Sequence, residues 1–89
     1  MIQVDGSLIV GTYDEADDEF TVQQVKHLTT ETVLTKSQCE QLYDYLKKHE
    51  KEEGGQVVSL YDQLLIPLKE NEIQLLVSDL GRVQQLYQS

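Results

Sequence analysis

The sequence is short of several residue types, and each shortage excludes a class of protein. Its 89 residues include no tryptophan, one cysteine, one proline and only seven lysines and arginines. The single cysteine, Cys39, cannot form a disulfide within the chain, which fits a reducing compartment. No apolar run approaches the roughly 18 residues that cross a bilayer, and the start MIQVDG lacks the regions of a signal peptide. We therefore expect a cytoplasmic protein.

The shortage of basic residues leaves a strongly acidic chain. Sixteen aspartates and glutamates against seven bases give a formal net charge of -9. A surface of this sign repels the phosphates of nucleic acids and of anionic lipids. We therefore expect no direct nucleic-acid binding and no membrane binding, but attraction to basic proteins. Residues 1–35 hold most of the imbalance, because Lys26 is their one base.

Catalytic and metal-ligating motifs are also missing. The chain has no glycine-rich phosphate loop and no GxSxG, CxxC or HExxH pattern. His27 and His49 have no second ligand at the spacing of a zinc site. On one helix, the distance between Cys39 and His49 would be roughly 15 Å, which excludes a nucleophile and base pair. We expect Cys39 to lie in the core, and we expect no enzymatic activity, no metal and no cofactor.

What the first 35 residues do contain is a series of strand signals. The Asp5-Gly6 pair between β-branched stretches predicts a tight hairpin with positive φ at both turn positions. Further β-prone segments at 7–13, 20–25 and 28–34 predict an antiparallel arrangement. The apolar alternation slips near Gln23-Gln24, which indicates a bulge.

After Thr35 the apolar residues recur every three or four positions, as is typical of amphipathic helices. Thr35 and Gln38 have the spacing of a capping box at the start of a first helix. Cys39 lies on the apolar stripe of this helix, with leucines that follow at helical spacing. We expect the helix to end at Gly54-Gly55, because glycine suits the positive φ of a helix exit.

The next segment has two interpretations. Its apolar spacing favours a short second helix, whereas the adjacent Val57-Val58 leaves a strand open. Pro67 ends this element, and a last helix begins either near Pro67 or at Asn71, where Asn71 and Gln74 form a second capping pair. The apolar residues of the short helix are Val57, Leu60, Tyr61, Leu64 and Leu65.

Strands followed by helices, instead of alternating with them, predict an α+β fold. We expect an N-terminal antiparallel meander of three to four short strands followed by two to three α-helices packed on one face. The chain is long enough for one domain, residues 1–89. Within it, residues 1–35 should be mostly β and acidic, and residues 36–89 mostly α.

The stretch TYDEADDEF contains the densest acidic run. It does not fit a calcium loop, because the sixth position from Asp14 is Glu19 instead of glycine. Its position between Tyr13 and Phe20 predicts a solvated hairpin tip. The alternative is a partner-binding acidic surface. The carboxylates of that surface would be Asp14, Glu15, Asp17, Asp18 and Glu19.

The last helix carries a second stripe beside its core stripe. Two leucines of this stripe would be exposed, and exposed apolar surface on a small domain often binds a second subunit or a partner. The alternative is that the stripe only borders the core. Tyr45 on the first helix is a further contributor. The residues of the candidate interface are Leu75, Asp79, Arg82 and Leu86.

These observations support two hypotheses of different classes. The first is a small acidic non-enzymatic regulator or inhibitor that binds a basic partner protein through the acidic surface. One form of it is nucleic-acid mimicry, as in small proteins of phage or mobile-element type. The alternative is a structural or assembly module, a homodimer or larger oligomer joined through the C-terminal helix. In that case the charge serves only solubility.

Overall fold

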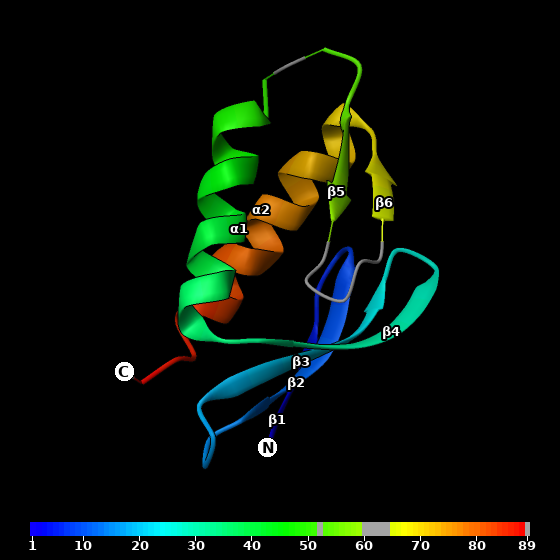
Figure 1. Ribbon diagram of the computed structural model, residues 1–89. Helices are drawn as coiled ribbons and strands as arrows, with labels where there is room; N and C mark the ends of the chain where they lie inside the picture. The colour runs from blue at the N-terminus through cyan, green and yellow to red at the C-terminus, as the bar shows by residue number, and fades with distance from the viewer. Residues whose placement is uncertain (52, 60–64, 89) are drawn as a thin grey trace.

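The computed structural model describes residues 1–51, 53–59 and 65–88, and it shows an antiparallel meander followed by two helices (Figure 1). The four strands form one sheet in the order β1-β2-β3-β4. This confirms the α+β class and the N-terminal meander. The strands are β1 (Ile2–Asp5), β2 (Ile9–Asp14), β3 (Glu19–Val25) and β4 (Leu28–Leu34).

The bulge expected in the third strand is confirmed. The pairing of β2 with β3 passes from Val10–Gln24 to Gly11–Val22, so that Gln23 is an extra residue. The pairing of β3 with β4 shifts at the same place. The extra residue resets the alternation, and Val22 and Val25 therefore both face the core although they are three positions apart.

The first hairpin forms, but the turn predicted at Asp5-Gly6 is wrong. Asp5 still belongs to β1 and pairs with Val10, and the loop consists of residues 6–8. Neither Asp5 nor Gly6 has a positive φ. A longer loop is favoured because its backbone surrounds a carboxylate from the distant helix α2 (Glu70–Gln84).

That carboxylate belongs to Asp79, whose side chain is buried with 2% of its surface exposed. It accepts hydrogen bonds from the backbone N–H groups of Ser7 at 3.0 Å, Leu8 at 2.7 Å and Ile9 at 3.1 Å. A Cβ on Gly6 would lie 2.6 Å from Cγ of Asp79. Glycine is therefore required at position 6 by this close approach and not by its φ angle.

The first helix, α1 (Lys36–His49), begins as the sequence predicts. Gln38 N–H donates to Oγ1 of Thr35 at 3.2 Å, and Thr35 N–H donates to Oε1 of Gln38 at 3.0 Å, which completes the capping box. The helix ends at His49, earlier than the expected Gly54-Gly55. Those glycines have positive φ and lead instead into the next strand.

The short helix predicted from position 57 is wrong, because β5 (Gln56–Ser59) and β6 (Leu65–Leu68) form an antiparallel ribbon. The alternation of the two strands buries Val58 and Ile66 in the core, although neither residue belongs to the apolar stripe of the predicted helix. The positions Leu60, Tyr61 and Leu64 of that prediction lie outside the described residues.

Helix α2 begins at Glu70, between the two predicted starts, which were near Pro67 and at Asn71. Pro67 lies within β6. The backbone N–H of Lys69 donates to Oε1 of Glu72 at 2.8 Å, and this bond takes the place of the predicted pair of Asn71 and Gln74. A carboxylate in the first turn also interacts favourably with the helix dipole.

In Figure 1 the two helices stand side by side above the four-stranded sheet, and the ribbon β5–β6 stands beside them. One continuous cluster of buried residues joins the meander, both helices and the ribbon. Its largest fully buried side chains are Tyr13, Phe20, Ile9, Leu34, Leu46, Ile66, Ile73, Leu76, Leu80, Val22, Val25 and Val83.

The bonds of Asp79 give a first testable prediction. Asp79→Ala leaves the N–H groups of Leu8 and Ile9 buried without a partner, and each such group costs about 1–3 kcal/mol. We expect a loss of roughly 2 to 6 kcal/mol in the free energy of unfolding, measured by urea denaturation. Asp79→Asn should lose less, because one carbonyl oxygen remains.

The exposed neighbour Ser78 provides the control, since Ser78→Ala should be nearly neutral. Gly6→Ala should destabilise the wild-type protein but have a smaller effect in the Asp79→Ala background, because the steric conflict disappears. Equal effects of Gly6→Ala in both backgrounds would contradict this account of the turn.

Candidate functional site

The acidic run forms the tip of the β2–β3 hairpin, where the sequence places it. Oδ1 of Asp14 accepts hydrogen bonds from the backbone N–H groups of Ala16 at 2.9 Å and Asp17 at 3.4 Å. Asp18 has a φ of 54°, a conformation that aspartate tolerates in turns. Asp14 and Asp18 therefore shape the turn itself.

Asp18 also ties this tip to the end of the chain. Its carboxylate accepts hydrogen bonds from the hydroxyl of Tyr13 and from the backbone N–H of Gln88. The ring of Tyr13 packs edge to face on Tyr87, with centroids 5.6 Å apart. Burial, and then the bond to Asp18, raise the pKa of Tyr13 to about 12. The main role of Asp18 is thus structural.

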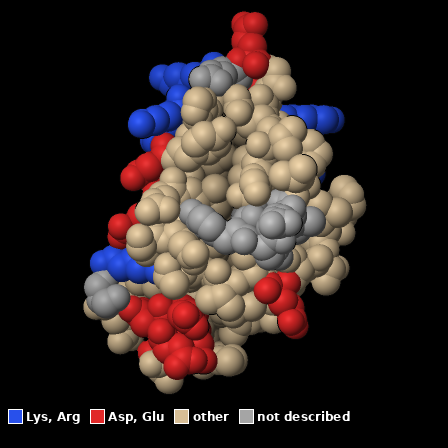
Figure 2. Space-filling model, viewed as in Figure 1, with Lys and Arg blue, Asp and Glu red and all other residues tan. Residues whose placement is uncertain are grey.

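The remaining acidic side chains are more accessible. Glu15 and Asp17 are exposed and Glu19 is half-buried, while Glu15 lies 3.6 Å from the N-terminal ammonium group. Figure 2 shows a dense patch of acidic side chains at the lower left of the molecule, with further acidic side chains elsewhere on the same face. This patch is a surface feature and not a buried site.

A shallow hollow lies between this tip and the start of α1. Asp17 and Glu19 line it from the hairpin, and Glu40 lines it from the helix. Nζ of Lys36 lies 4.0 Å from Oε1 of Glu40, and the described lining residues comprise one lysine and four acidic residues. The full lining is Asp17, Asp18, Glu19, Thr35, Lys36, Ser37 and Glu40.

The sequence alone missed the contribution of Glu40, for a clear reason. In the sequence, Glu40 and Asp44 lie four positions apart with lysines at helical spacing on either side, a pattern typical of a solvated helix face. In the structure Glu40 lines the same hollow as the hairpin tip, although the two segments are about 20 residues apart in the sequence. Only the fold could reveal this neighbour.

The second stripe of the last helix does not form one exposed surface. Asp79 is buried and bonded to the β1–β2 turn, and Leu86 packs partly buried against the core. Leu75 is exposed over 39% of its surface and Arg82 is also exposed. The stripe prediction is wrong for Asp79, and the predicted interface is reduced mainly to Leu75 and Arg82.

The thiol of Cys39 lies in the core, as the sequence predicts, with none of its surface exposed. Burial, and then the nearby Glu40, raise the pKa of this thiol to about 11. In the described part of the chain, no three histidine, cysteine, aspartate or glutamate side chains come together as a metal site would require. Nor does any described helix have the length and apolar character needed to span a membrane.

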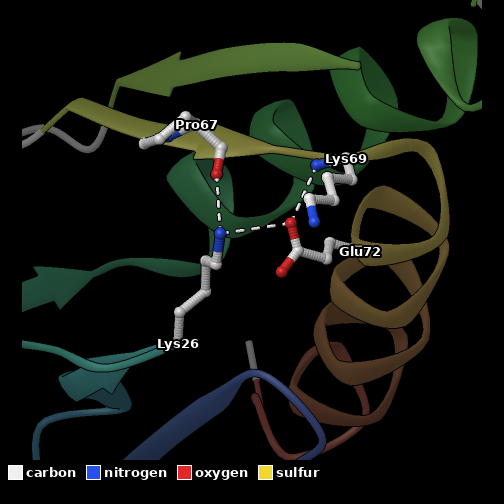
Figure 3. A network of polar contacts seen from close by, with 4 residues as sticks. All are labelled: Lys26, Pro67, Lys69 and Glu72. Carbon is white, nitrogen blue, oxygen red and sulfur yellow. Dashed lines mark hydrogen bonds and ion pairs between the residues drawn. The ribbon is translucent and has the colours of Figure 1, made fainter. Parts of the chain in front are cut away.

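A polar network that sequence reasoning missed joins the β3–β4 turn to the C-terminal half (Figure 3). Nζ of Lys26 donates to the carbonyl of Pro67 at 3.0 Å and to Oε1 of Glu72 at 3.1 Å. Both charged side chains are only 18% exposed. The sequence contains one indication that Lys26 has a specific role, because it is the one base among residues 1–35.

Comparison with known proteins gives no relative from which a function could be transferred. No family model matches the chain, and no curated protein or solved structure is significantly similar to it. The function therefore has to be argued from the surfaces described above.

The network of Figure 3 predicts a pH dependence of stability. The backbone bond from Lys69, followed by the bond from Lys26, lowers the pKa of Glu72 below its ordinary value of 4.5. Glu72 therefore stabilises the folded state above this value, and the contribution disappears as the pH falls through the lowered pKa. Glu72→Gln should destabilise the protein at pH 7 and have a smaller effect near pH 3, measured by urea denaturation.

Glu31→Gln is the matched control, because Glu31 is an exposed carboxylate on β4. It should change stability little at either pH. A Glu72→Gln effect that is as large at pH 3 as at pH 7 would show that the charge of Glu72 is not what stabilises the fold.

Proposed function

We propose that the protein is a small non-enzymatic binding protein, a regulator or inhibitor that covers a basic surface of a partner protein. The observation that supports this proposal is the convergence of carboxylates from two elements on one hollow. Asp17 and Glu19 come from the hairpin tip and Glu40 comes from α1. A net charge of -9 adds a long-range attraction for a basic partner.

In this proposal only part of the acidic run contacts the partner. Asp14 and Asp18 accept hydrogen bonds from the turn and from the C-terminal segment, so their carboxylates have less freedom to meet a ligand. Asp17, Glu19 and Glu40 carry the binding role in this proposal, with Glu15 at the edge. Nucleic-acid mimicry is one form of it, in which these carboxylates take the places of phosphates on the partner.

Self-assembly through α2 receives less support. Of the four residues of the candidate interface, Asp79 and Leu86 are directed toward the protein interior. The exposed part, Leu75 and Arg82, is small compared with the surface of about 800 Å² per partner in a typical stable complex. We therefore keep binding of a basic partner as the proposed function.

The test compares two triple variants that change the net charge equally. Asp17→Asn, Glu19→Gln and Glu40→Gln together neutralise the hollow, whereas Glu31→Gln, Asp44→Asn and Glu53→Gln neutralise exposed carboxylates elsewhere. Proteins captured from the native host at low salt are identified by mass, and their affinity is then measured. The first triple variant should weaken binding roughly threefold to a hundredfold, since exposed ion pairs each contribute about 0.2–1 kcal/mol.

The control triple variant should bind nearly as the wild type does, and high salt should weaken all binding. Equal losses in both triple variants would mean that total charge, and not the hollow, attracts the partner. Capture that is insensitive to salt would contradict the proposal as a whole.

A further inference from the structure

The two outer edges of the ribbon β5–β6 differ in their capacity to accept another strand. On β6, Pro67 has no backbone N–H, and its carbonyl accepts the hydrogen bond from Lys26. Figure 3 shows this carbonyl directed away from β5 and toward Lys26. Proline and lysine are the residues that protect sheet edges against strand addition. The outer edge of β6 is therefore closed.

At Val57 the outer edge of β5 carries neither a proline nor a bond from lysine, although beside it the hydroxyl of Tyr45 on α1 donates to Oε1 of Gln56 at 3.4 Å. In an antiparallel strand, the N–H and C=O of one residue point to the same side. Since the carbonyl of Pro67 points outward, its partner Val57 also directs its N–H and C=O outward, away from β6. Among the described residues, no backbone hydrogen bond joins Val57 to another element. Val57 is also 62% exposed.

A hollow runs beside Val57, between β5 and α1, and the described residues that line it are all uncharged. Buried Leu42 and Val58 form its apolar base, and Tyr45, which is 44% exposed, forms a wall on the helix side. The lining residues are Gln41, Leu42, Tyr45, Val57, Val58 and Ser59.

We propose that an extended segment of the basic partner binds in this hollow as a third strand beside β5. Its main chain would bond to the outward N–H and C=O of Val57, and alternate side chains would pack on Leu42 and Tyr45. The basic character of the partner rests on the proposed function. The edge and the hollow are independent observations.

Charge and area favour a partner segment over a second copy of the chain. Two copies that each carry a net charge of -9 repel one another, whereas a segment flanked by lysine or arginine is attracted. The exposed apolar side chains here are Tyr45, Val57 and Leu65. Even one whole aromatic side chain offers only about 150–250 Å², so these partly exposed groups fall short of the roughly 800 Å² per partner of a stable dimer.

The experiment uses Val57→Pro in the full-length chain. Because the N–H of Val57 points outward, proline removes the group that an incoming strand needs but leaves the bonds between β5 and β6 in place. Val57→Thr retains the N–H and is the matched control. The probe is a phage-displayed library of short random peptides, selected on the wild-type protein alone, and the affinity of each selected peptide is then measured for the wild type and for both variants.

We expect the selected peptides to alternate apolar residues and to carry lysine or arginine. Val57→Pro should weaken their binding by about tenfold or more, while Val57→Thr should bind as the wild type does. Circular dichroism tests whether Val57→Pro is folded. Tyr45→Ala, which removes a wall of the hollow without changing the backbone, should independently weaken binding.

Peptides that bind Val57→Pro and Tyr45→Ala as well as the wild type, or a selection that yields no binder, would overturn the proposal. Selected peptides without basic residues would contradict the basic character that we assign to the partner segment. If the wild type sediments as a dimer and Val57→Pro as a monomer, the occupant of the hollow is a second copy of the chain and not a partner segment.

The two proposals can fail separately. A host protein that is released by the acidic-hollow triple variant but not by Val57→Pro would refute the strand site and retain the acidic surface. Release by Val57→Pro alone would refute the acidic surface and retain the strand site.

Discussion

The carboxylate of Asp79 holds the two halves of the chain together. It joins α2 to the β1–β2 turn, 70 residues or more away in the sequence, and it provides the acceptor for three backbone N–H groups. Once α2 is fixed there, the same helix brings Glu72 to Lys26. The segment after it brings the hydroxyl of Tyr87 to the carbonyl of Leu34 at 2.6 Å. These polar links between the meander and the C-terminal half therefore depend on the placement of α2, whereas the bond from Lys26 to Pro67 reaches β6.

Hydrogen bonds within the protein reduce the number of carboxylates that can attract a partner. A count of -9 treats all carboxylates alike, but those of Asp18, Glu72 and Asp79 are bonded within the protein. The carboxylates that a partner can reach are therefore fewer than those of the acidic run, and they are not all part of that run. Two residues of the run serve the turn, and Glu40 joins from a helix that the linear sequence keeps apart. The charge that is available to a partner is set by the fold.

The features that could be predicted from the sequence are those whose cause lies nearby in the chain. The capping box of Thr35 and Gln38, the bulge at Gln23 and the acidic hairpin tip each involve neighbours within a few positions. The burial of Asp79 has its cause in a distant turn, so a charged residue on a helix stripe gave no indication of it. Apolar residues from position 57 onward fit a helix by spacing alone, but the ribbon buries Val58.

The two edges of the ribbon β5–β6 differ in their protection against strand addition, and the net charge of the chain bears on that difference. A two-stranded ribbon is marginal by itself, and this one is stabilised by its buried face and by the bond from Lys26 to Pro67. That bond closes one edge, whereas the edge at Val57 has no such block. An open edge ordinarily invites pairing between identical chains. Here each chain is strongly acidic, and repulsion between copies opposes that pairing while it favours a basic strand. In the proposed binding mode the acidity would therefore protect β5 against pairing between copies, as proline and lysine protect β6, and would still admit a basic strand.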